Sequence, residues 1–436
     1  MYINRLIDND LELWSKETKH KPILLRGARQ VGKSTSVRKL AEQFEFFVEV
    51  NFEKKKAAHS LFQSDLEPKT ICEELSVMYD TPIIAGKTLV FFDEIQTCLP
   101  AISSLRFFYE DYPELHLIAA GSLLEFALEE LPSFGVGRIR SMFMYPLSFA
   151  EFLNACGCNL LLGAIQKSSP AKPLLQAIHD KAVDLLKRFL IIGGMPEVVA
   201  KYVENGEITS CQTVLDDLLN SLKKDFSKYR KRVPDLRLRE VFEAVAHQVG
   251  GKFNYSKIDS DSNHRQLKEA LELLKMAGLV IPVLHTSGNG IPLGAGVNPS
   301  KQKMLILDTG ILQRLSGLNL AEILLEDDFS LVNKGGIAEN FAGLELLKAA
   351  SCFTEQQLYF WQRDKLNAHA EVDFLIQQGD KIVPIEVKSG TSGKMQSLHL
   401  FLKEKSIDKG IRCSLENFVH YDNIDVYPLY AISNII

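Results

Sequence analysis

The sequence predicts an α/β fold class built from a parallel sheet, then a helical and winged-helix region, then a mixed α/β domain. In residues 21–150, short apolar runs such as Ile23-Leu24-Leu25 and Leu89-Val90-Phe91-Phe92 alternate with helical patterns, and a third run spans 115–120. Runs of this length between helices are typical of parallel strands covered on both faces. Residues 174–249 show helical periodicity only, and residues 335–430 return to mixed helix and strand.

Three changes in composition divide the chain. They are a polar linker at 167–173, a Gly- and Pro-rich stretch at 286–300 and an acidic turn at 326–328. The length of 436 residues also suggests about three domains. We therefore expect a core at 1–166, a helical region at 174–235, a winged-helix domain at 236–325 and a C-terminal domain at 330–436.

Composition and charge exclude several classes of protein. A chain that is 46% hydrophobic and 24% charged can bury several cores, which excludes disordered, collagen-like and disulfide-scaffold proteins. The formal charge of -5 means that any nucleic-acid affinity must come from a local basic patch. No apolar run approaches the length of about 18 residues that a membrane helix needs, and no secretory signal opens the chain. The seven cysteines are scattered, so we expect reduced thiols, a cytoplasmic location and no membrane partner.

A phosphate-binding motif follows the first apolar run. Gly27-Ala-Arg-Gln-Val-Gly32-Lys33-Ser34 fits the pattern G-x-x-x-x-G-K-[ST] between a strand and a helix. In this pattern Gly27 and Gly32 let backbone N–H groups surround phosphate, Lys33 reaches the β- and γ-phosphates, and the Ser34 hydroxyl holds Mg²⁺. The motif predicts ATP and Mg²⁺ as cofactors and makes residues 1–166 a P-loop ATPase core.

A second acidic element supports the same site. The apolar run 89–92 ends in Asp93 and Glu94. We expect Asp93 to contact the magnesium shell and Glu94 to orient the attacking water.

With these motifs the chain resembles the prokaryotic AAA+/STAND-like ATPases. The resemblance places Ser122, after the run 115–120, as a sensor beside the γ-phosphate. It also makes Arg138 and Arg140 candidates for the arginine finger, acting within the chain or across a subunit interface. Such an arginine is worth roughly 10³ to 10⁵ in rate. A surface salt bridge is the alternative role for these two arginines.

Two features of the middle region suggest nucleic acid as a partner. Residues 223–239 hold eight basic residues and two acids, with Phe226 and Tyr229 between them, a composition that suits a surface following phosphates. A solvated helix end is an equal alternative. A helix at 236–249, a second helix capped by Asp261-Ser262 and ended by Gly278, and strands around the Gly-rich stretch form a winged-helix pattern. Glu269 and Glu272 on the second helix would face phosphates, so a winged helix used only for packing remains open.

The C-terminal region holds a pair of acidic strands. Glu371-Val-Asp373-Phe-Leu-Ile376 and 381–388 both alternate, and a two-residue turn at Gly379-Asp380 would place Asp373 opposite Glu386. Two carboxylates about 4 Å apart repel by roughly 4 kcal/mol at an effective dielectric near 20. Such a face requires a cation, a lysine or a raised pKa. A divalent metal on Asp373 and Glu386, with Lys388 polarising a water, suits phosphodiester hydrolysis; a surface ion pair of Glu386 and Lys388 is the alternative.

These strands resemble the PD-(D/E)xK nucleases, and the resemblance makes Glu339 an additional metal ligand. The chain as a whole resembles a bacterial ATPase family with a C-terminal nuclease-like domain of unassigned function. Its supporting motifs are Gly193-Gly-Met-Pro-Glu197, Leu307-Asp-Thr-Gly310 and Ala338-Glu-Asn-Phe341. Pro384 within the second strand suggests an edge position or a bulge.

Three hypotheses follow from these motifs. The first is a Mg-dependent ATPase that acts on DNA or another nucleic acid through the winged helix and the nuclease-like domain. The second is a nucleotide switch for a protein partner or a homo-oligomer, with an inactive nuclease-like module. The third is a nuclease that uses ATP binding only for assembly.

Overall fold

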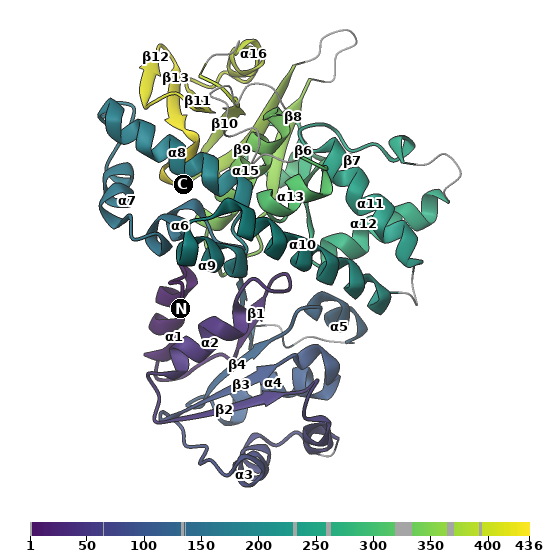
Figure 1. Ribbon diagram of the computed structural model, residues 1–436. Coiled ribbons are helices and arrows are strands. Elements are labelled where there is room, and N and C mark those ends of the chain that lie inside the picture. The colour runs from purple at the N-terminus through teal and green to yellow at the C-terminus, as the bar shows by residue number, and fades with distance from the viewer. Residues whose placement is uncertain are drawn as a thin grey trace. The chain divides into compact units, whose positions relative to one another are not determined.

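The computed structural model describes residues 2–63, 65–131, 135, 137–229, 233–258, 263–318, 334–363, 370–391 and 395–436. They divide into two compact units (Figure 1). The first contains residues 1–146, 276–278 and 351–355, and the second contains residues 147–275, 279–350 and 356–436. Both units combine helices with a sheet, which confirms the predicted α/β class.

The first unit is built on a parallel five-stranded sheet with the order β2-β3-β4-β1-β5. The strands are β1 (Ile23–Arg26), β2 (Phe46–Asn51), β3 (Thr88–Asp93), β4 (His116–Ala120) and β5 (Arg140–Phe143). The helices are α1 (Ile7–Ser15), α2 (Lys33–Ala41), α3 (Pro68–Tyr79), α4 (Leu99–Asp111) and α5 (Leu124–Glu130).

The central strands of this sheet, β1, β3 and β4, are buried on both faces. Every residue of β3 and β4 is buried, and α3, α4 and α5 share one apolar core with alternate residues of the strands. Helix α2 packs against β3 and β4. This arrangement confirms the parallel strands expected from the apolar runs, and it brings the carboxyl ends of β1, β2, β3 and β4 to one edge.

Helices form the first part of the second unit, as predicted for residues 174–249. They are α6 (Phe149–Ala155), α7 (Asn159–Gln166), α8 (Gln176–Ile192), α9 (Pro196–Asn205), α10 (Ile208–Asp225) and α11 (Asp235–Gln248). Further along the chain lie α12 (His264–Met276), α13 (Thr309–Leu315), α15 (Lys334–Ala349) and α16 (Gln396–Lys405). The predicted cap residues of α12, Asp261 and Ser262, lie outside the described residues.

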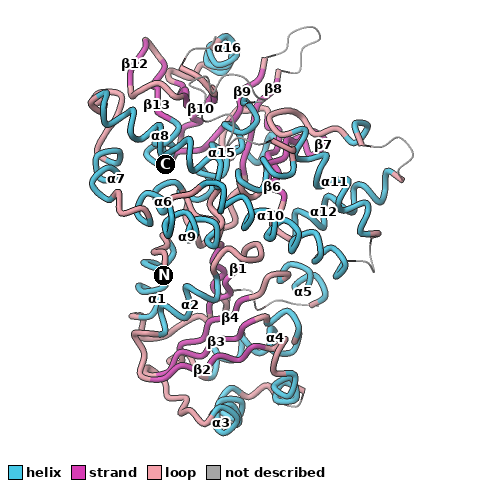
Figure 2. The backbone as a smooth tube through the Cα atoms, viewed as in Figure 1, coloured by secondary structure: helices cyan, strands magenta, loops and turns pink. Residues whose placement is uncertain are grey.

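The second unit contains a mixed eight-stranded sheet with the order β12-β13-β11-β10-β9-β8-β6-β7 (Figure 2). Its strands are β6 (Val280–Thr286), β7 (Val297–Ile306), β8 (Leu358–Gln362), β9 (Glu371–Gln378), β10 (Lys381–Val387), β11 (Gly410–Ser414), β12 (Val419–Tyr421) and β13 (Ile424–Pro428). Strand β6 pairs in parallel with β8. The two strands expected in a winged helix are therefore continuous with the C-terminal sheet.

The hairpin of β9 and β10 has the predicted register. Lys381 pairs with Gln378, and the pairing runs to Ile385 opposite Phe374, so the next positions are Glu386 and Asp373. Gly379 has a φ of 58°, as the first position of a type II′ turn requires. The edge position suggested by Pro384 is wrong, because β10 lies between β9 and β11. Its pairing with β11 begins only at Ile385, one residue after the proline.

Candidate functional site

The P-loop connects β1 to α2 at the carboxyl edge of the first sheet. A Cβ atom on Gly27 would lie 2.1 Å from the carbonyl oxygen of Met144, so only glycine fits there. Gly32 is the N-cap of α2 and has a left-handed conformation. The loop therefore has the backbone shape that the motif predicted for a phosphate cradle.

Lys33 is folded back over this loop. Its Nζ donates hydrogen bonds to the carbonyl oxygens of Gly27 at 2.8 Å and Ala28 at 2.7 Å. Burial lowers the pKa of Lys33 to about 8, against the opposing effect of Glu94 and Asp93. The ammonium is thus held against the loop by two of its backbone carbonyl groups.

Ser34 and Asp93 meet at the same edge. The Ser34 hydroxyl donates to Asp93 Oδ1 at 3.0 Å, and the Asn51 side-chain amide donates to Asp93 Oδ2 at 2.9 Å. Burial raises the pKa of Asp93, although the bond from Ser34 opposes the rise. Asn51 was missed from the sequence, although it ends β2 directly opposite Asp93.

Glu94 follows Asp93 in a left-handed conformation with a φ of 51°. Its Oε2 accepts hydrogen bonds from Gln96 Nε2 at 2.6 Å and from the Ser122 hydroxyl at 3.4 Å. The predicted sensor and the predicted water-orienting carboxylate therefore lie together. Gln96 was also missed, and its only sequence signal is its place two residues after the acidic pair.

The two candidate finger arginines lie away from the P-loop within the first unit. Arg140 opens β5 opposite Ile23, at the far end of the strand from Gly27, which is roughly 13 Å along the sheet. It forms an ion pair of 2.6 Å with Glu17, and Arg138 pairs with Glu110. If Arg138 is an arginine finger, it would therefore contact the nucleotide of another subunit.

The polar groups at this edge fit Mg²⁺ and a nucleoside triphosphate. The Ser34 hydroxyl and the Asp93 carboxylate are ligands of the kind that Mg²⁺ prefers. The loop amides at the start of α2 and the ammonium of Lys33 supply the positive potential that phosphates need.

A second polar cluster lies in the C-terminal sheet. Asp373 Oδ2 accepts a hydrogen bond of 2.8 Å from the backbone N–H of Val387, and Lys388 Nζ donates to Glu386 Oε1 at 2.6 Å. Glu386 is buried, and its Oε2 has no hydrogen-bond partner among the described residues. The predicted residues Asp373, Glu386 and Lys388 are thus brought together.

A buried lysine that sequence reasoning missed completes this cluster. Lys303 of β7 places its Nζ 2.8 Å from Glu339 Oε1 and 3.5 Å from Asp373 Oδ1, and it pairs with Glu371. The expectation that the acidic face requires a lysine or a raised pKa is confirmed in both respects. Burial raises the pKa values of Glu339 and Glu386 to about 7.

The predicted metal set of Glu339, Asp373 and Glu386 forms one cluster with the ammonium of Lys303 inside it. Within the described ranges, no three His, Cys, Asp or Glu side chains are arranged to hold a metal ion. The physical reason is that Lys303 already occupies the space between Glu339 and Asp373. The residues present therefore fit an ammonium and do not fit a divalent metal.

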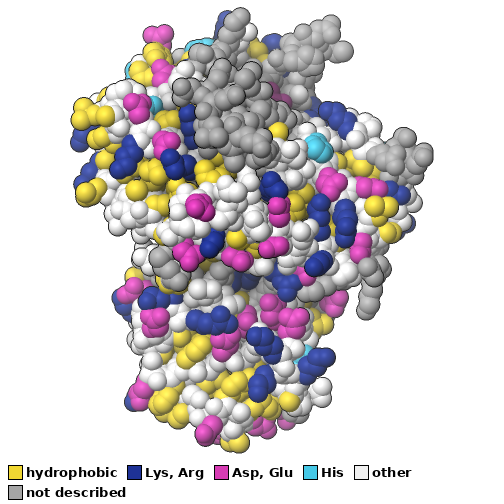
Figure 3. Space-filling view, viewed as in Figure 1, with side chains coloured by type: hydrophobic (Ala, Val, Ile, Leu, Met, Phe, Trp, Pro, Cys, Tyr) yellow, Lys and Arg dark blue, Asp and Glu magenta, His cyan; other side chains and the backbone are white. Residues whose placement is uncertain are grey.

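The basic segment is partly paired with acids. Lys223 forms an ion pair of 2.7 Å with Glu243, and Arg237 pairs with Glu240 at 2.6 Å. The side chains of residues 228–232 are not among those that the structure describes. On the face shown in Figure 3, basic and acidic side chains are interspersed.

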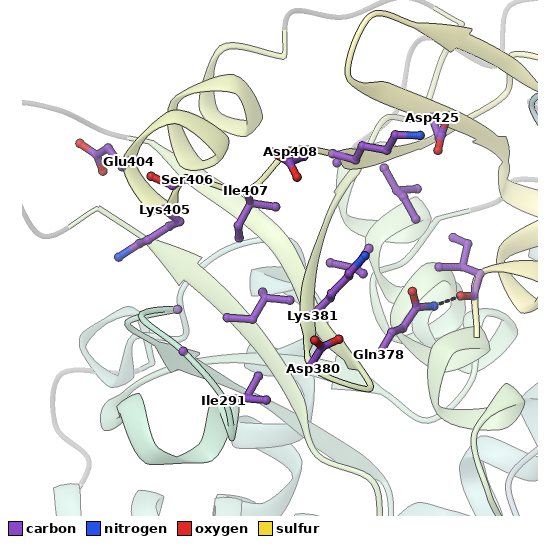
Figure 4. Close-up of a pocket in the computed structure, with 18 of the residues that line it drawn as sticks. Ile291, Gln378, Asp380, Lys381, Glu404, Lys405, Ser406, Ile407, Asp408 and Asp425 are labelled. Carbon is purple, nitrogen blue, oxygen red and sulfur yellow. Dashed lines mark hydrogen bonds between the residues drawn. The ribbon is translucent and has the colours of Figure 1, made fainter.

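A hollow of about 970 Å³ lies at the turn of the β9–β10 hairpin (Figure 4). Neither Asp373 nor Glu386 is among the residues that line it. The charged residues that line it are of both signs: Asp380, Lys381, Glu404, Lys405, Asp408, Lys409 and Asp425. This mixture favours no class of ligand. In the part of the chain that the structure describes, no helix is both long and apolar enough to cross a membrane.

Comparisons with known proteins match three segments of the chain to domain families. Residues 19–153 match an AAA domain, residues 183–322 a domain of unknown function (DUF8612) and residues 334–432 a second domain of unknown function (DUF4143). An uncharacterized protein of Haemophilus influenzae is 25% identical over 280 residues, which are 62% of this chain and 58% of the relative. The match thus spans less than two thirds of that relative.

Two solved structures are also similar to the chain. The Walker-type ATPase PABY2304 of Pyrococcus abyssi is 17% identical, with a TM-score of 0.46 over 72% of this chain and 96% of that chain. Unliganded Pif1 from Bacteroides sp is 18% identical, with a TM-score of 0.23 over 36% of this chain and 45% of that chain. The AAA match and the geometry of the P-loop edge lead to the same conclusion: residues 19–153 have an AAA-type P-loop ATPase fold.

Proposed function

We propose that the chain is a Mg-dependent ATPase. The observation that carries this proposal is the convergence of Lys33, the Ser34–Asp93 pair and Glu94 on one edge of a parallel sheet. Phosphoryl transfer depends on positioning and charge stabilisation, and this edge supplies both. Bound Mg²⁺ would neutralise charge on the phosphates, held by the Ser34 hydroxyl and the Asp93 carboxylate.

The residues divide the work of binding and hydrolysis. The loop amides bind phosphate, and Lys33 exchanges the Gly27 and Ala28 carbonyls for phosphate oxygens. Glu94 orients the attacking water and accepts its proton, while Gln96 and Ser122 hold the Glu94 carboxylate in place. Binding and hydrolysis therefore rest on different side chains and can be separated by mutation.

The test compares ATP binding with ATP turnover. Lys33→Ala should abolish turnover and weaken ATP binding strongly, whereas Glu94→Gln should keep binding and lower turnover by about 10² to 10⁴. Lys39→Ala is the matched control, because Lys39 lies on the same helix, is exposed and pairs with Glu42. ATP hydrolysis by Lys33→Ala at the parent rate would refute the proposal.

We further propose that nucleic acid is what this ATPase acts on or responds to. The proposal rests on the basic segment 223–239 and on helix α12, which follows α11 along the chain. It is tested by measuring the ATPase rate with and without single- and double-stranded DNA at several salt concentrations. Stimulation that weakens steeply with salt is expected, since phosphate contacts release counterions. A rate insensitive to both DNAs would count against this proposal.

The alternative is a nucleotide-dependent protein switch with a catalytically inactive nuclease-like module. One observation favours it over nuclease chemistry, namely the ammonium of Lys303 within the carboxylate cluster. It predicts no cleavage of DNA in Mn²⁺. Cleavage that is abolished in Asp373→Ala would exclude it.

A further inference from the structure

Lys303 is a lysine whose whole side chain is withdrawn from solvent. Its exposed fraction is 0%, and its ammonium contacts carboxylates from α15 and β9. It also lies 5.3 Å from the centre of the Phe360 ring. A buried ammonium is stable only when it is paired, so these carboxylates fix its position.

We propose that Lys303 is the permanent counter-ion of this carboxylate cluster and takes the position that a divalent cation would otherwise fill between Glu339 and Asp373. Divalent cations of this class bind carboxylate oxygens at about 2.0–2.6 Å. The same oxygens are 2.8 Å and 3.5 Å from the Lys303 ammonium. The two cations would repel each other at these distances, so they exclude each other. The proposal concerns the second unit and does not depend on ATP hydrolysis.

The other oxygens of the cluster leave little for a metal. The second oxygen of Asp373 accepts from the Val387 N–H, and one oxygen of Glu386 accepts from Lys388. Among the described residues of this cluster, Oε2 of Glu386 is the one buried oxygen without a partner. Of the buried oxygens described in the cluster, one is therefore left unpartnered beside Lys303, whereas Mg²⁺ or Mn²⁺ takes several oxygen ligands.

Removing the lysine should therefore create a metal site. In Lys303→Met, the carboxylates of Glu339, Glu371 and Asp373 would face one another without a cation. Carboxylate clusters of this kind suit Mn²⁺. The variant should be destabilised in EDTA and recover stability when Mn²⁺ is added.

The chain offers a matched control in Lys348. The side chain of this lysine is also largely withdrawn from solvent, with 6% exposure. Its ammonium lies 5.9 Å from the centre of the Phe189 ring and pairs with the buried Glu345 at 3.2 Å. Its replacement, Lys348→Met, removes a buried ammonium without leaving three carboxylates together. It should lose stability and gain nothing from Mn²⁺.

The experiment measures Mn²⁺ binding by electron paramagnetic resonance and thermal stability for the nucleotide-free full chain. We expect Lys303→Met to bind one Mn²⁺ more than the parent, at least about tenfold more tightly than any parental site. Its melting temperature should rise by about 5 °C with Mn²⁺. Both gains should disappear in Lys303→Met/Asp373→Asn.

Two outcomes would overturn the proposal. One is a Lys303→Met chain that folds and gains no Mn²⁺. The other is a parental Mn²⁺ site that is lost in Asp373→Asn, because it would show that metal and Lys303 share the cluster. The second comparison needs only the parent and Asp373→Asn, so it decides the matter even if Lys303→Met does not fold. Because nucleotide is absent, failure of the ATPase proposal would leave the result unchanged.

Discussion

The side-chain amide of Gln96 donates a 2.6 Å hydrogen bond to the carboxylate of Glu94. Glu94 itself has a left-handed backbone conformation. Gln96 therefore orients the side chain of a residue whose backbone is already constrained. We expect Gln96→Ala to lower kcat by about tenfold to a hundredfold while KM for ATP changes little, because in the proposed mechanism the Glu94 carboxylate acts on the attacking water and not on ATP binding.

Steady-state kinetics at saturating Mg²⁺ check this expectation. Gln43→Ala is a suitable control, since Gln43 is exposed and follows the C-terminal end of α2. Parallel changes in kcat and KM would mean that Gln96 only supports the fold of the site.

The lowered pKa of Lys33 predicts a pH dependence of nucleotide binding. The ammonium must be protonated to bind phosphate, and burial brings its pKa to about 8 in the free protein, with Glu94 and Asp93 opposing the shift. Above that pH, binding must first take up a proton. The affinity for ATP should therefore fall by up to about tenfold per pH unit above 8.

Calorimetric titrations with ATP between pH 7 and pH 9.5 test this dependence, and proton uptake can be read from buffers of different ionisation enthalpy. In Lys33→Ala the residual affinity should be independent of pH in this range. A parental affinity that is equally flat would contradict the assignment.

The close approach of Gly193 to Asp308 should make position 193 sensitive to an added methyl group. Asp308 is buried and accepts hydrogen bonds from the N–H groups of Gly194 at 2.6 Å and Ile311 at 3.0 Å. A Cβ on Gly193 would lie 2.1 Å from Asp308 Oδ1, and Gly193 has a φ of 73°. We expect Gly193→Ala to cost about 3 kcal/mol or more.

The control for this prediction is Gly157→Ala. Gly157 has a similar φ of 71°, but a Cβ added there would meet nothing within 4 Å, so the backbone cost of about 1–2 kcal/mol should stand alone. Urea unfolding followed by the fluorescence of Trp361, with Trp14 replaced by Phe, reports on the second unit. Equal losses in the two variants would show that the Asp308 contact gives way.

If Arg138 acts across a subunit interface, two inactive variants should restore each other's ATPase activity when mixed. Within the first unit it pairs with Glu110 and precedes β5, away from the P-loop edge. If it serves as a finger, Arg138→Ala should lower turnover by about 10³ or more. An equimolar mixture of Arg138→Ala and Lys33→Ala chains should then regain activity, because one interface in the mixture joins an intact P-loop to an intact arginine. No recovery, with both chains folded, would argue for a surface salt bridge.

The sequence was sufficient where local chemistry determines structure. The P-loop motif needs only eight consecutive residues, and a two-residue turn is enough to set the β9–β10 register that places Asp373 beside Glu386. Short apolar runs identified β3 and β4, because the interior residues of strands covered on both faces are apolar.

The sequence was insufficient where a partner lies far along the chain. Lys303 is 36 residues from Glu339 and 70 from Asp373, and a single lysine in a strand carries no sign of its burial. Asn51 is 42 residues from Asp93, and only the neighbouring order of β2 and β3 brings them together. The same limit affected Pro384, since strand order decides whether a proline lies at an edge.

The parallel pairing of β6 with β8 has a consequence for how this polypeptide can be divided. A fragment starting near residue 334 would expose the bare flank of β8 to any other extended chain. It would also leave three acids without the interior ammonium that β7 provides. Expressed separately, the C-terminal part should therefore aggregate or bind metal ions. The intact protein should do neither through these surfaces.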